Sequence, residues 1–254
     1  MIKKLTLFLM GLILGLFGMA QDFSMSNLQS GLQSTPNNNK SVESTYFLTH
    51  STSQTIMSGT SVACSASGLH TDNSYFRTFD LVSDFGINNS IEVTSVDFGI
   101  ELASGATGSQ PATVNIYTLS GALSWANLTL ISSESISIAD QSLTVLNVPI
   151  SGIIPSGSVL VVEVFTPNGQ VDGNSFFLGS NNLGQTAPSY LAAGDCGITE
   201  PINVADLGFP DMQIVMNVNA EPYFPAVPLS NAAIMLALLL MSGFAFYTYR
   251  RKMA

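Results

Sequence analysis

Few side chains in this chain of 254 residues stand in a sequence motif that would make them a catalytic nucleophile or general base. The only histidines are His50 and His70, and no Gly-x-Ser-x-Gly turn is present to hold a catalytic serine. Serine is so abundant that finding Ser, His and Asp in one chain says nothing about a triad. A cysteine nucleophile would need a free thiol, and neither Cys64 nor Cys196 lies in a known nucleophile motif. We therefore expect a protein that is not an enzyme.

Carboxylates and one indole are the other groups with binding or catalytic chemistry. A glycoside hydrolase needs two carboxylates across a cleft, and the acids on expected strands are Glu92, Asp97, Glu101, Glu134 and Glu163. The sequence does not single out a pair among them. Trp125 is the only tryptophan, and its ring would bind a sugar if it lay on an exposed face, although a single tryptophan in a β-sandwich is more often core. A carbohydrate-binding module or a glycan hydrolase is therefore the alternative to a non-enzymatic role.

Metal ligands are sparse. His70 and Asp72 would share one face of an extended segment, but zinc needs a third and usually a fourth ligand. Calcium accepts Asp, Asn and backbone oxygens from loops. The loops that offer such oxygens contain Asp72 with Asn73, Asp172 with Asn174, and Asp195. No EF-hand loop is present, so we expect no cofactor, with calcium as the one metal that these loops suggest.

The charge balance restricts the partners. Lysine and arginine together number 7 against 17 aspartates and glutamates, and only Lys40 and Arg77 lie between the two end segments. Such an acidic surface repels phosphate backbones, so no nucleic-acid partner is expected. Arg77 is the only cation inside the expected domain and should pair with a carboxylate such as Asp97 or Asp80.

The two cysteines stand near the beginning and the end of the expected domain. An even pair in an exported chain usually forms a disulfide, so we expect a bond between Cys64 and Cys196. Closing so long a loop would stabilise the fold by roughly 5 kcal/mol in the chain-entropy model, as an upper figure.

Alternating apolar residues and turn signals predict an all-β domain over residues 60–219. The segment 159–165 is apolar at both parities except Glu163, which indicates a central strand. Strands without intervening helices favour an antiparallel β-sandwich of the jelly-roll type. The clear candidate strands span 75–82, 91–101, 113–119, 128–138, 143–150, 159–165, 175–178 and 212–218.

One candidate strand changes its apolar parity. Ile91 and Val93 alternate in one phase, whereas Val96 and Phe98 alternate in the other. A single strand buries both sets on one face only with an extra residue between them, so we predict a β-bulge near Ser95.

Residues 1–20 have the pattern of a secretory signal peptide. Lys3 and Lys4 precede an apolar stretch over 5–17, and small residues follow before residue 21. The export machinery and a signal peptidase are therefore expected partners. The next segment, 21–59, is a polar spacer that also holds a candidate first strand.

Residues 232–254 predict a transmembrane helix with a basic cytoplasmic end. The uncharged run 232–249 would form a helix of about 27 Å, just enough to cross the hydrocarbon core. The cluster of Arg250, Arg251 and Lys252 should stay in the cytoplasm, which places the preceding domain outside.

A Pro-rich stalk over 220–231 precedes this helix and ends in the motif Val227, Pro228, Leu229, Ser230 and Asn231. The order of short Pro-containing motif, membrane helix and basic end resembles bacterial C-terminal sorting signals of the PEP-type and IPTL-type. The motif departs from both, because Val-Pro-Leu-Ser stands in place of Ile-Pro-Thr-Leu-Ser and no Glu follows Pro228. The resemblance implies a membrane sorting protease or transpeptidase that cuts near Pro228; an uncut anchor is the alternative.

Three segments of the middle, 73–79, 189–197 and 214–218, are similar to β-sandwich regions of secreted bacterial proteins, a resemblance that carries no activity. With the two end segments they predict an exported protein of the bacterial cell envelope, outer surface or extracellular matrix, anchored in a membrane at least transiently. Its expected role is display or adhesion, with a glycan or another surface molecule as partner.

Overall fold

The computed structural model describes residues 45–225 and, in the tail, Met235, 239–242, Phe244 and Tyr249, which are helical. Among the described residues no helix is long and apolar enough to cross a membrane. The predicted signal peptide, the sorting motif, the basic cluster and most of the predicted transmembrane helix lie outside the described residues, so these calls stay predictions.

The described domain consists of strands and two short 3₁₀ helices. In chain order the elements are β1 (Tyr46–Thr49), β2 (Ser65–Ala66), β3 (Leu69–His70), β4 (Asn73–Asp80), β5 (Ile91–Ser104), β6 (Ser109–Leu119), η1 (Trp125–Asn127), β7 (Leu128–Ala139), β8 (Gln141–Ile154), β9 (Val159–Thr166), β10 (Ser175–Leu178), β11 (Ser180–Asn181), β12 (Ser189–Ala193), η2 (Gly194–Cys196), β13 (Ile198–Asn203), β14 (Gln213–Ile214) and β15 (Met216–Pro222).

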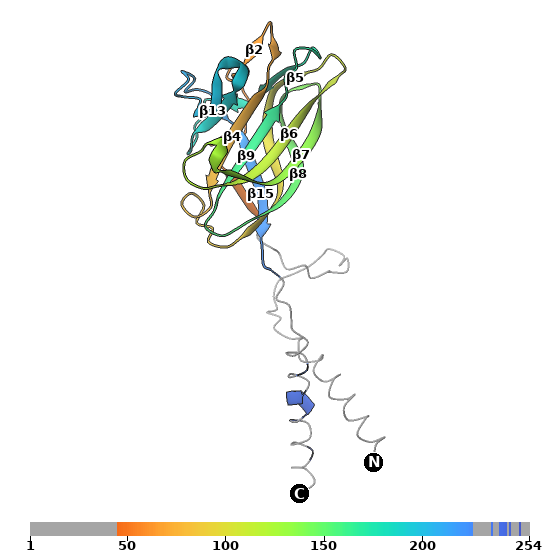
Figure 1. Cartoon of the computed structure of the whole chain (residues 1–254), viewed down its shortest axis with the longest axis vertical. Coiled ribbons are helices and arrows are strands. Elements are labelled where there is room, and N and C mark those ends of the chain that lie inside the picture. The colour runs from red at the N-terminus through yellow and green to blue at the C-terminus, as the bar shows by residue number, and fades with distance from the viewer. Residues whose placement is uncertain (1–44, 226–234, 236–238, 243, 245–248, 250–254) are drawn as a thin grey trace, which may run out of the picture. The chain divides into compact units, whose positions relative to one another are not determined.

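Two antiparallel sheets form the domain (Figure 1). The first has the order β1-β15-β5-β10, with β8 on the other side of β5. The second has the order β13-β12-β4-β9-β6-β7, and two small two-stranded sheets, β11-β14 and β2-β3, complete the fold. The predicted all-β antiparallel architecture is confirmed, while the jelly-roll type stays a prediction. The strand β1 falls within the predicted spacer, where a first strand was a candidate.

The inner faces of both sheets share one apolar core. In β9 Val162 and Val164 face this core, while Val161 belongs to a second, smaller cluster on the outer face of the same sheet. Strand β9 lies between β4 and β6, so the prediction of a central strand at 159–165 is confirmed. Burial on both faces explains why this strand is apolar at both parities.

The predicted bulge occurs in β5. In the pairing with β15, Val93 lies opposite Ala220 and Ser95 opposite Asn219, which leaves Thr94 as the extra residue on β5. The register with β8 also shifts at this point. Val93 and Val96 are both fully buried on the two sides of the shift. The extra residue therefore keeps both apolar phases on the core face.

The predicted disulfide is present. Cys64, just before β2, is bonded to Cys196 in η2, at a sequence separation of 132 residues and a Cα–Cα distance of 5.9 Å. Asn73 at the start of β4 holds the same loop, since its side chain accepts a hydrogen bond from the Cys64 N–H and donates one to the Cys64 carbonyl.

Two glycines allow three backbone segments to lie in close contact, namely the middle of β5, the β10–β11 junction and the β14–β15 junction. Gly99 donates to the Val215 carbonyl, Gly179 donates to the Gly99 carbonyl, and Val215 donates to the Gly179 carbonyl. A Cβ on Gly179 would lie 2.6 Å from the Gly99 carbonyl carbon, and one on Gly99 would meet the tip of Ile56. Only glycine at both positions permits this approach.

Alanine at these two glycines should therefore destabilise the domain. We expect Gly179→Ala to lower the free energy of unfolding by about 1–3 kcal/mol, because the backbone must move to admit the methyl group. Gly99→Ala should also destabilise the domain, because its methyl group would meet the tip of Ile56 and lie 3.0 Å from the Gly179 backbone. Urea denaturation measures both. Gly194→Ala is the matched control, because its Cβ would have no neighbour closer than 3.8 Å. Equal stability of all three variants would contradict the requirement for glycine at positions 99 and 179.

Candidate ligand-binding sites

Arg77 is fully buried in β4 and has neutral partners. Its guanidinium donates to the Gln185 side-chain oxygen at 2.9 Å, to the Ala187 carbonyl at 2.7 Å, to the Ser51 hydroxyl at 3.4 Å and to the Ile214 carbonyl. Burial lowers the pKa of Arg77 to about 10. The predicted pairing with Asp97 or Asp80 is wrong, and a cation so enclosed is part of the interior.

The two carboxylates expected beside Arg77 have other partners. Asp97 lies on the outer face of the first sheet and accepts hydrogen bonds from Asn147 at 2.6 Å and Asn219 at 2.9 Å. Asp80 caps the turn after β4, where it accepts from the backbone N–H of Ser83 at 2.9 Å. These hydrogen bonds lower the pKa of Asp80.

His50 lies close to Arg77 in a row with a hydroxyl and a carboxylate. Its Nδ1 is 2.7 Å from the Thr186 hydroxyl, and its Nε2 is 3.6 Å from Asp84. The ring stacks on Phe79 and is 3% exposed. Burial, reinforced by Arg77, lowers its pKa. The row resembles a nucleophile–base–acid arrangement only in its residue types, because the carboxylate is beyond hydrogen-bond distance and the imidazole is shielded from a substrate.

His70 is also an interior residue. Its Nδ1 donates to the Asn174 carbonyl at 3.1 Å, and its ring packs edge-on against Phe176. Burial lowers its pKa. Among the residues that the structure describes, no group of three or more His, Cys, Asp and Glu side chains lies together to hold a metal ion.

Trp125 stands at the outer face of the second sheet, 39% exposed. Its ring meets Phe76 edge to face at 5.2 Å, and its Nε1 donates to the Thr199 carbonyl at 2.9 Å. A cavity of 210 Å³ lies beside it, bordered also by Asp72 and Ser74. The indole is thus fixed in orientation while part of it stays accessible, as a sugar-stacking ring would need.

A buried carboxylate lies on the same outer face. Glu163 accepts hydrogen bonds from the Tyr117 hydroxyl at 2.6 Å and from the Asn115 amide at 2.9 Å. Burial and this hydrogen bond raise the pKa of Tyr117. Phe76 pairs with Glu163 in the strand register and packs under Trp125, so aromatic and acidic groups share this surface.

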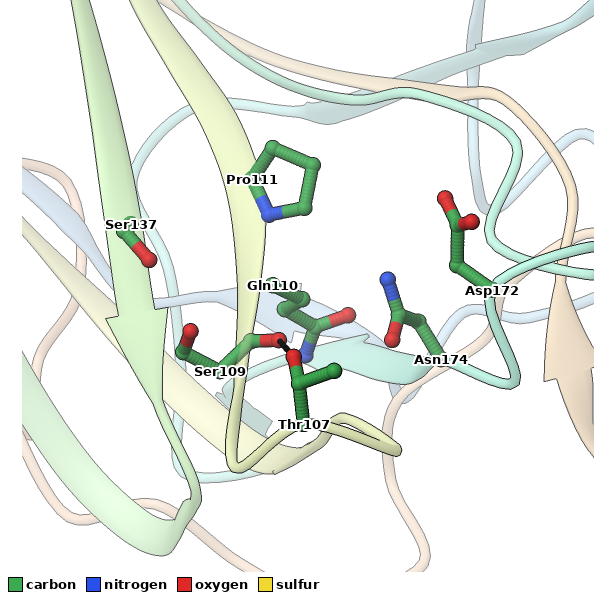
Figure 2. A pocket seen from close by; sticks show the side chains of 7 residues that line it. All are labelled: Thr107, Ser109, Gln110, Pro111, Ser137, Asp172 and Asn174. Carbon is green, nitrogen blue, oxygen red and sulfur yellow. Dashed lines mark hydrogen bonds between the residues drawn. The ribbon is translucent and has the colours of Figure 1, made fainter.

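A second polar pocket, of 350 Å³, lies between the β5–β6 hairpin and the loop before β10 (Figure 2). Gln110 is 1% exposed, and its side-chain nitrogen donates to the Ser175 carbonyl at 3.0 Å. Its side-chain oxygen is buried without a hydrogen-bond partner. The lining residues are Thr107, Ser109, Gln110, Pro111, Ser137, Asp172 and Asn174.

Two of the candidate calcium ligands meet in this pocket, namely Asp172 and Asn174. The other candidates do not join them. The Asn73 side chain is engaged with the backbone of Cys64, and Asp195 accepts a hydrogen bond from Asn168. Sequence reasoning missed Gln110, although its place in the alternation of Ala112 and Val114 marks it as a polar residue on the core face.

Comparisons with known proteins give low similarity. No family model and no curated protein matches the sequence. A structure of the cysteine protease and lectin-like domains of Cwp84, a surface layer associated protein of Clostridium difficile, is 13% identical, with a TM-score of 0.47 over 75% of this chain and 37% of that one. A structure of infectious bursal disease virus Gx strain is 12% identical, with a TM-score of 0.24 over 77% of this chain and 42% of that one. The chain thus spans well under two thirds of either protein, and neither similarity assigns it a fold or an activity.

The two buried imidazoles predict how stability depends on pH. Both pKa values are lowered in the folded state, so unfolding takes up protons once the pH falls below the ordinary value of about 6.5. Stability is full above that pH and is lost on acidification. Urea unfolding at about pH 7.5 and about pH 5 should show this loss, and His50→Gln and His70→Gln should each reduce it. A pH dependence that neither substitution alters would be the contrary result.

Proposed function

We propose that this chain is an exported β-sandwich displayed at a bacterial cell surface or in its matrix, where it binds or adheres and catalyses no reaction. The observation that carries the proposal is the position of the chain ends. Both ends of the described domain leave from one end of the sandwich, and the pocket of Figure 2 lies at the other.

The strand register defines these two ends. Tyr46, where β1 begins, pairs with Ala220, and Pro222, where β15 ends, pairs with Ile91 at the start of β5. The pocket lies beside the hairpin that follows Ser104 at the other end of β5. A strand of 14 residues spans about 45 Å. A tether at one end would therefore hold the pocket away from the surface that carries the domain.

The disulfide supports export. A cross-link between Cys64 and Cys196 persists in an oxidising compartment and is rare in the cytosol. The burial of both imidazoles supports a role without catalysis, since His50 and His70 are engaged in the interior. Within this proposal the C-terminal segment acts as a sorting signal, cut near Pro228 by a membrane protease or transpeptidase.

The mature protein should therefore differ from the translated chain at both ends. We expect mass spectrometry of envelope and culture fractions to find an N-terminus near Gln21 and no peptide that continues from 226–231 into the apolar tail. Intact Met1 in a cytosolic fraction would contradict export. A mature peptide that runs through Pro228 into the tail would contradict cleavage and leave a simple anchor.

The exposed indole favours a second candidate, a carbohydrate-binding module. Because Trp125 is the only tryptophan, fluorescence excited selectively at the indole reports on the surroundings of this one ring, which include the cavity. Titration with soluble cello-, chito- and mannooligosaccharides should give a saturable change that Asp72→Asn weakens. Asp211→Asn is the charge-matched control, because Asp211 borders a different cavity. A flat titration with all three would speak against this candidate.

A further inference from the structure

We propose that the pocket around Gln110 is the binding site of the displayed domain and takes one unit of a neutral, polyhydroxylated ligand, a saccharide residue. This inference rests on the proposed display function and adds the chemical class of the ligand. It concerns a pocket other than the one beside Trp125, and the two share no lining residue.

The unpaired oxygen of Gln110 is the observation that points to a ligand. Buried polar atoms are almost always hydrogen-bonded, because desolvation without a partner is costly. The Gln110 nitrogen is held by the Ser175 carbonyl, so the amide cannot rotate without losing that bond. Its oxygen is directed toward Asn174 in the pocket wall (Figure 2). The side chain is thus a fixed acceptor that requires a donor from the pocket.

The hydrogen-bonding groups around Gln110 indicate which chemical class of ligand the pocket would bind. A cation site would present oxygen acceptors alone, with more than one carboxylate for strong binding. This wall instead offers hydroxyls from Thr107, Ser109 and Ser137, an amide from Asn174 and one carboxylate from Asp172. A sugar hydroxyl both donates and accepts, so it matches acceptors and donors side by side.

The remaining features fit a sugar residue. Pro111 adds an apolar ring to the wall, against which the carbon face of a sugar can pack. The lone carboxylate, in a domain dominated by acidic residues, disfavours anionic ligands. The pocket opens at the end of the sandwich opposite the chain ends, where a polymer outside the cell would reach it.

Saturation-transfer NMR on the full exported chain tests the site. The probes are D-glucose, D-galactose, D-mannose and N-acetyl-D-glucosamine, each titrated into the millimolar range. We expect saturable transfer to at least one of them. Asp172→Asn and Gln110→Met should each weaken binding about tenfold, because each removes an acceptor from the pocket. Asp172 is exposed, so its substitution leaves the fold intact even if Gln110→Met does not.

The controls separate this site from its alternatives. Asp206→Asn removes a charge outside the pocket and Trp125→Ala disables the other cavity, and neither should change the affinity. Binding abolished by a calcium chelator would make the pocket a cation site and overturn the inference. So would binding that only Trp125→Ala removes, or transfer to none of the four sugars. None of these results would bear on surface display, which is tested separately by mass spectrometry of the termini of the mature protein.

Discussion

The burial of one guanidinium is the constraint on which the middle of this structure depends. Arg77 projects from β4 of the second sheet and donates to the Ile214 carbonyl in β14, to the Ala187 carbonyl and to the Ser51 hydroxyl. These groups come from segments far apart in the sequence. Removing the charge would leave buried acceptors unpaired, and moving any segment would leave the charge uncompensated. The loops between β11 and β12 and the entry to β14 are therefore held in one arrangement.

Alternation revealed the strands because one face of each sheet is buried, but it did not reveal the partners of Arg77. Strand β4 is apolar at both parities, with Tyr75 and Phe79 on the core face and Phe76 outside, so the sequence did not show which way Arg77 points. Its strongest acceptors are backbone carbonyls, which every residue carries. The bulge in β5 was predictable, in contrast, because the apolar side chains of Val93 and Val96 show from their residue type which positions face the core.

The candidate sites likewise combine residues that could be predicted from the sequence with contacts that only the fold reveals. Trp125 could be singled out from the sequence, and Asp172 with Asn174 as a polar loop. Their meeting with Gln110 depends on the β9–β10 connection returning beside the β5–β6 hairpin, which no local pattern reports. A polar residue on the core face of a strand was a readable signal at Gln110. Only the structure shows that its side-chain oxygen has no hydrogen-bond partner. If both the oxygen and the nitrogen were hydrogen-bonded, the buried amide would be an ordinary interior contact.

The disulfide bears on the pocket through a short series of contacts. Cys64 is held to the start of β4 by Asn73, and the Thr71 N–H donates to the Cys64 carbonyl. The neighbouring His70 donates through its backbone and its ring to the Asn174 carbonyl, and its own carbonyl accepts from Gly169. Asn174 forms one wall of the pocket. The cross-link therefore does more than restrict the unfolded chain: it fixes the loops that shape the distal end. A rigid polar wall loses little conformational entropy when it binds a ligand, which favours binding at the proposed saccharide site.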